Sequence, residues 1–130
     1  MTIGSAGARR GLLLSVLLLS CSSGSTGPSS GVLNVKLNSL HGDEGAVLFT
    51  IKGGPVESVE AVSGIVHSAQ LDANTLRVVV TGDLSSATIA RVRIADATQA
   101  SRYLAVINQV ATRPTYGLRD PGLYLITVAP

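Results

Sequence analysis

The 130-residue sequence has little of several residue types on which whole classes of protein depend. It contains one cysteine, two histidines, no tryptophan, three tyrosines and one phenylalanine. A single cysteine excludes an intramolecular disulfide, and with two histidines it leaves too few ligands for a zinc site built from Cys and His alone. So few aromatic rings cannot form a stacking platform for nucleic bases, and we therefore expect no nucleic-acid partner.

Sequence motifs of catalysis and metal binding are also missing. No Gly-x-Ser-x-Gly elbow presents a nucleophilic serine, and no loop carries Asp or Asn at the alternate positions that a calcium site requires. His41, Asp43 and Glu44 cluster an imidazole with two carboxylates, which fits an acid/base or metal site. A polar hairpin loop with turn geometry from Gly and Asp explains them more simply. His67 is interpreted as an ordinary strand residue, so the sequence predicts no catalytic residue, metal or cofactor.

The N-terminus has the layout of an export signal. Arg9 and Arg10 are the only charges in the first twenty residues, and the apolar run 11–20 follows them. A basic region before a short apolar run is typical of a secretory signal peptide. The run is too short for a bilayer, which takes about 20 apolar residues to cross.

The residues that end this run, Leu18-Leu19-Ser20-Cys21, resemble the lipobox of bacterial lipoproteins. The resemblance implies that residues 1–20 are removed by signal peptidase II and that the Cys21 thiol carries diacylglycerol, which anchors the chain in a membrane of the cell envelope. In a host with two membranes, Ser22 resembles the family's default signal for the outer membrane. The alternative is an unpaired thiol in a conventionally secreted protein.

A flexible tether and a change of net charge follow from this interpretation. Residues 21–31 are mostly Ser and Gly, a composition that predicts a flexible linker with a root-mean-square span of about 18 Å. Without Arg9 and Arg10, eight basic residues balance the eight acidic ones. The sequence pI near 9.0 thus belongs to the export signal, and bulk charge does not point to a polyanionic partner.

Residues 32–130 have the pattern of one all-β domain. Only 14% of the chain is charged and 45% is hydrophobic, which excludes a largely disordered protein. Apolar and polar residues alternate, and turn signals such as Gly53-Gly54-Pro55 and Pro121-Gly122 separate the alternating stretches. The pattern predicts a single antiparallel β-sandwich of seven or eight strands. The expected strands lie at 33–37, 47–51, 56–62, 65–70, 76–80, 89–94 and 124–128.

The segment 96–112 has two interpretations. It fits a helix with Asp96 as N-cap and Gln99 completing a capping box. It also fits a turn followed by a strand from Tyr103 to Val110, and the β-branched pair Val106-Ile107 favours that strand.

The stretches 45–51, 56–64, 76–82 and 87–94 resemble the strand order of cohesin-type, Ig-like sandwiches, and the chain also resembles small lipoproteins of environmental bacteria. The resemblance implies the sandwich architecture, and fold similarity alone does not confer dockerin binding.

The loop 113–122 is the best candidate for a binding site, because binding residues concentrate in loops. Arg113, Tyr116, Arg119 and Asp120 would serve a protein or glycan partner, although Tyr116 also fits simple packing over the end of the sandwich. A second candidate is a basic stripe of Arg91 and Arg93, joined by Arg77 if it lies on the same sheet. We favour a solvated face there.

Taken with the anchor, these residues predict a lipid-anchored envelope protein that acts as a non-catalytic binding module. The alternative is an envelope hydrolase whose site is not recognisable from sequence, with Asp43 and Glu44 as its adjacent carboxylates.

Overall fold

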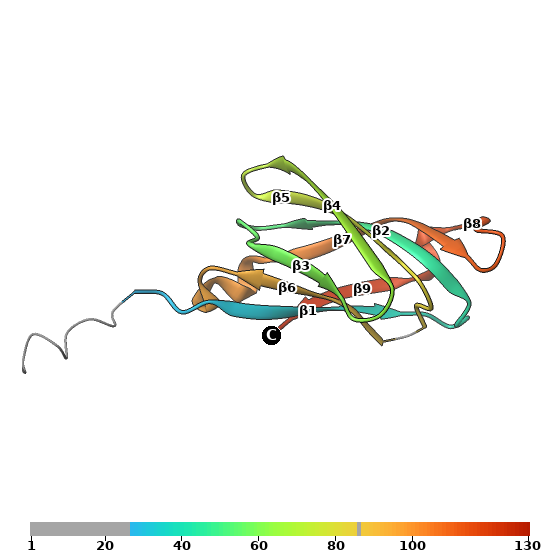
Figure 1. The fold of residues 1–130 in the computed structure, drawn as a ribbon, viewed down its shortest axis with the longest axis horizontal. Helices are drawn as coiled ribbons and strands as arrows, with labels where there is room; N and C mark the ends of the chain where they lie inside the picture. The colour runs from blue at the N-terminus through green and yellow to red at the C-terminus, as the bar shows by residue number, and fades with distance from the viewer. Residues whose placement is uncertain (1–26, 86) are drawn as a thin grey trace, which may run out of the picture.

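A computed structural model describes residues 27–85 and 87–130. The predicted signal peptide and Cys21 lie outside the described residues. Within them the chain forms nine strands and two short 3-10 helices, drawn in Figure 1. In chain order these are β1 (Gly31–Asn38), β2 (Glu44–Lys52), β3 (Ser58–Ala61), β4 (Ile65–Asp72), β5 (Thr75–Thr81), β6 (Ala87–Ile94), η1 (Ala97–Arg102), β7 (Leu104–Thr112), β8 (Leu118–Arg119), η2 (Pro121–Leu123) and β9 (Leu125–Ala129).

The strands form two antiparallel sheets. Sheet A has the order β3-β6-β1-β9, and sheet B has the order β4-β5-β2-β7-β8. The predicted all-β sandwich is confirmed. The described residues contain one strand more than expected, because β8 has only two residues and is too short to leave an alternating pattern in the sequence.

The core lies between the sheets and is built mainly from alternate residues of β1, β2, β5 and β6. In β2, Val47, Phe49 and Ile51 are fully buried, while Leu48 between them is only half-buried. In β1, Leu33, Val35 and Leu37 are buried and the residues between them are not. Side chains in a strand point to opposite faces in turn, so this alternation is what commits each strand to one orientation.

The ambiguous segment 96–112 contains both a short helix and a strand. The Asp96 side chain accepts a hydrogen bond from the Thr98 backbone N–H at 3.0 Å and caps η1, after which β7 begins at Leu104. The favoured strand is therefore confirmed. Between the two, Tyr103 is buried and donates its hydroxyl to the Pro55 carbonyl at 2.6 Å, and this burial raises the pKa of Tyr103.

The register of the strands gives the sandwich two distinct ends. β1 enters at Gly31, beside the end of β6, and we call this the N-terminal end. β1 leaves at Asn38, beside the start of β9, and we call this the loop end. The loop end carries the connections 39–43, 62–64, 82–85 and 113–117 together with η2. Eight residues of strand separate the two ends by about 25 Å, and Figure 1 shows the chain entering at the left and the β1–β2 turn at the right.

Candidate functional site

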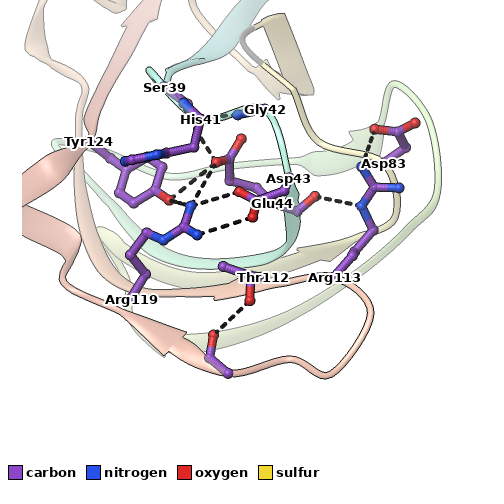
Figure 2. A network of polar contacts seen from close by, with 11 residues as sticks. Ser39, His41, Gly42, Asp43, Glu44, Asp83, Thr112, Arg113, Arg119 and Tyr124 are labelled. Carbon is purple, nitrogen blue, oxygen red and sulfur yellow. Dashed lines mark hydrogen bonds and ion pairs between the residues drawn. The ribbon is translucent and has the colours of Figure 1, made fainter.

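A polar network at the loop end joins the β1–β2 connection to Arg119 of β8 and to Tyr124, which lies between η2 and β9, as Figure 2 shows. At its centre is Glu44, whose side chain has no exposed surface. Its Oε2 accepts hydrogen bonds from the Ser39 hydroxyl at 2.7 Å and the Tyr124 hydroxyl at 3.2 Å, and it lies 3.7 Å from Nη1 of Arg119. The other oxygen, Oε1, accepts no hydrogen bond from any described residue. The network thus holds a fully buried carboxylate through one of its two oxygens.

Arg119 links this buried carboxylate to the half-exposed Asp43. Its guanidinium donates from Nη1 to Oδ1 of Asp43 at 2.7 Å and from Nη2 to Oδ2 at 3.1 Å, and Nη1 also donates to the Tyr124 hydroxyl at 3.0 Å. Two parallel bonds of this kind are the strongest arrangement for an arginine and a carboxylate. The hydrogen bond from Arg119 lowers the pKa of Asp43, and the same bond raises the pKa of Arg119. Burial raises the pKa of Tyr124, with the Arg119 hydrogen bond acting in the opposite direction.

Arg113 makes a second connection on the other side of the β1–β2 segment. Its backbone N–H donates to the Asp43 carbonyl at 2.8 Å, its Nε donates to the Glu44 carbonyl at 3.2 Å, and its Nη2 pairs with Asp83 at 3.0 Å. The side chain lies directly over Gly45, where an added Cβ would overlap Arg113 Cγ and lie 3.0 Å from the Tyr116 ring. Gly45 is therefore what lets the 113–117 loop lie against β2.

The four residues predicted for the binding loop have different positions. Arg113 and Arg119 both contact the 43–44 segment. The 113–122 loop and the Asp43–Glu44 pair, which are separate candidates in the sequence, therefore form one cluster. Tyr116 packs one side against Gly45 and stays 51% exposed. Asp120 accepts a hydrogen bond from the Gly122 N–H at 2.9 Å, which caps η2, and it takes no part in the network.

The interpretation of 41–44 as a simple polar turn is only half right. Gly42 does supply turn geometry, with φ of 88°, and His41 is exposed. For Glu44 the interpretation is wrong, because Glu44 is the first residue of β2 and is buried. Sequence reasoning missed the roles of Ser39 and Tyr124. Tyr124 lies just before β9 and not in the strand expected at 124–128. Neither a serine in a turn nor a tyrosine at the start of an alternating stretch signals a distant partner.

The three arginines considered as a basic stripe do not form one. Arg91 and Arg93 are exposed on sheet A, opposite Glu60 and Ser58 of β3. Arg77 belongs to β5 in sheet B, so the three arginines do not share a sheet. His67 is exposed in the edge strand β4, as expected for an ordinary strand residue.

A shallow depression of about 470 Å³ lies beside the network at the loop end. Leu40 is 94% exposed on its rim, and Leu123 and Leu125 are also more than half exposed. The depression is lined by Asn38, Ser39, Leu40, Gly122, Leu123, Tyr124 and Leu125. Exposed leucines around a depression are suited to contact with another molecule.

The described residues contain no group of three or more His, Cys, Asp or Glu side chains that could hold a metal ion. Within the same ranges, no helix has the length and apolar character needed to cross a membrane. No protein-family model matches the chain, and no curated protein or solved structure matches it either.

The Asp43–Arg119 pair is expected to make stability depend on pH below about 4. A carboxylate with a depressed folded pKa stabilises the fold above its unfolded value of about 3.9, and this contribution disappears as the pH falls through the folded pKa. Urea unfolding of wild type at several acidic pH values should therefore show a steeper loss than Asp43→Asn. Glu57→Gln, an exposed acid near the N-terminal end, should keep the wild-type slope. Equal slopes for wild type and Asp43→Asn would contradict the assignment.

Proposed function

We propose that the protein is a lipid-anchored component of the bacterial cell envelope and that its β-sandwich is a non-catalytic binding module. The observation that carries the proposal is the direction in which β1 runs through the sandwich. The chain enters the domain at the N-terminal end, while the polar network and the leucine-lined depression lie at the loop end. An anchor attached through residues 21–31 thus leaves the candidate binding surface free.

The anchor rests on the lipobox resemblance of Leu18-Leu19-Ser20-Cys21. Each buried methylene contributes about 0.8 kcal/mol to membrane binding, so two or three acyl chains on Cys21 give stable attachment without a transmembrane helix. With Ser22 in the next position, the outer membrane is the proposed destination in a host that has two membranes.

The non-catalytic assignment is supported by how the acidic side chains are used. Both carboxylates that a hydrolase would need are engaged by Arg119, and Glu44 is closed off from solvent. A general acid or base has to exchange its proton with substrate or water. The network is better suited to holding the loop end rigid, which lowers the entropy cost of binding a protein or glycan partner there.

The anchor is tested by Cys21→Ser. We expect wild-type protein from a bacterial envelope to partition into the detergent phase on phase separation, and the variant to appear as an unprocessed precursor or in the aqueous phase. Ser22→Ala retains the cysteine and should partition like wild type. Equal partitioning of wild type and Cys21→Ser would overturn the anchor.

The same envelope preparation tests the binding surface by chemical cross-linking. Leu40→Ser removes the most exposed leucine and leaves the network intact. It should weaken cross-linking to a partner while the protein stays in the detergent phase. Cross-linking that is unchanged by Leu40→Ser and Leu123→Ser together would exclude the depression as the binding surface.

A further inference from the structure

Strand β4 is an edge strand with no neighbour on one side. It ends sheet B, so the backbone N–H and C=O groups that point away from β5 have no strand to pair with in the described fold. β4 has eight residues, whereas the other edges of the described sheets are shorter: β3 has four, β8 has two and β9 has five. It is the longest edge that the sandwich offers to another strand.

β4 also lacks most of the usual devices that block edge pairing. Its sequence, Ile-Val-His-Ser-Ala-Gln-Leu-Asp, contains no proline and no lysine. It has one bulge, at Leu71 between Gln70 and Asp72, and residues 65–70 pair with β5 without interruption. Seven of its eight residues are exposed, and only Val66 packs partly against the core. Ile65 is 60% exposed and Leu71 is 52% exposed. In Figure 1 the tip of the β4–β5 hairpin projects beyond the rest of the sandwich.

The sequence of β4 is complementary to itself when read in the opposite direction about Ser68. In antiparallel pairing centred there, Ile65 lies opposite the bulged residue Leu71 of a second copy, and His67 lies opposite Ala69. The twofold symmetry gives two such Ile65–Leu71 pairs, and apolar pairs across strands are stabilising. No two charges of the same sign face each other.

Other centres fit worse. Centring on His67 places two imidazoles opposite each other and leaves Ile65 against Ala69, while centring on Ala69 places Asp72 against Val66. Net charge also permits self-association, because residues 21–130 carry equal numbers of basic and acidic side chains.

We propose that β4 is the interface of a homodimer in which two copies pair antiparallel about Ser68 and join their five-stranded sheets into one continuous sheet. The occupant of the edge is thus a second copy of this chain. Such an interface is isologous, as a twofold axis requires. The two N-terminal ends then point in opposite directions, and the loop ends stay free. Both tethers reach one membrane when the strands lie along its surface, but the pairing itself does not depend on the lipid anchor.

Disulfide trapping tests the pairing directly. Residues opposite each other in antiparallel strands have Cα atoms about 4.5–5.5 Å apart, which a disulfide can bridge. In the full chain, Ser68→Cys should give a band of twice the chain mass on a non-reducing gel after mild oxidation. Ser58→Cys, exposed on the edge strand β3, is the matched control and should stay monomeric. Both variants are made with Cys21 and with Cys21→Ser, which separates this result from any effect of the anchor.

The register has its own test. A mixture of His67→Cys and Ala69→Cys chains should form a mixed disulfide, whereas either variant alone should form much less dimer. Ile65→Lys combined with Leu71→Lys in the Ser68→Cys chain should abolish the dimer band, because four ammonium groups would then meet across the interface. Equal trapping of Ser68→Cys and Ser58→Cys would overturn the proposal, and so would preferred trapping of His67→Cys or Ala69→Cys with itself.

Discussion

Substituting Gly64 by alanine is expected to lower the free energy of unfolding by about 3 kcal/mol or more. Gly64 lies where the chain crosses from β3 in sheet A to β4 in sheet B, with φ of 88°. A Cβ there would overlap the carbonyl oxygen of Thr81 and lie 3.2 Å from the Cα of Gly82. Both obstacles are backbone atoms of the packed β5 end, so they cannot rotate away as a side chain would.

Gly42→Ala is the matched control for this substitution. Gly42 has the same φ of 88°, but an added Cβ would meet nothing within 4 Å. The left-handed backbone conformation costs both variants about 1–2 kcal/mol, so the difference between them isolates the collision at Gly64. Urea unfolding followed by circular dichroism measures both values. Equal losses would mean that the crossover relaxes freely and that Gly64 matters only through its φ angle.

Glu44→Ala is expected to lower the free energy of unfolding by about 3 kcal/mol. Removing one partner from a buried charged network leaves the remaining polar groups without that hydrogen-bond and charge partner. The Ser39 and Tyr124 hydroxyls would lose their shared acceptor, and Arg119 would keep only Asp43 and the Tyr124 hydroxyl. The substitution also leaves a cavity, since the Glu44 side chain is completely buried. Thermal or urea unfolding near neutral pH measures the loss.

Glu44→Gln separates hydrogen bonding from charge in the same position. Glutamine preserves the shape and one acceptor oxygen, so its cost should be about 1–2 kcal/mol, below that of alanine. This variant also keeps the test informative if Glu44→Ala does not fold. A Glu44→Ala protein as stable as wild type would show that the network does not stabilise the loop end.

Most of the strands could be predicted because their burial is periodic. Val47, Phe49 and Ile51 mark the inner face of β2 in the sequence as clearly as in the structure. The helix-or-strand ambiguity at 96–112 had a physical basis as well, since Asp96 does cap a short helix before β7 begins.

The site could not be predicted to the same degree, because its contacts join residues far apart in the chain. Glu44 pairs with Tyr124, 80 positions later, and Arg119 pairs with Asp43, 76 positions earlier. In the sequence, His41-Gly42-Asp43-Glu44 has the composition of any surface turn. Glu44 would face outward if the alternation of Val47, Phe49 and Ile51 continued to the start of β2. The register of β2 against β7 shifts between Glu44 and Ala46, and this bulge at Gly45 turns Glu44 inward. The sheet to which Arg77 belongs could not be predicted either, because alternation indicates which face of its strand a residue occupies but not which sheet contains the strand.

The position of β1 also has a mechanical consequence. It is the first strand of the domain and an interior strand of sheet A, paired antiparallel with β6 on one side and β9 on the other. A force applied to the chain before Gly31 acts along the strand, perpendicular to its inter-strand hydrogen bonds. Those bonds are then loaded together in shear and do not open one after another. Force arriving at the N-terminal end is therefore resisted by both neighbours of β1 at once.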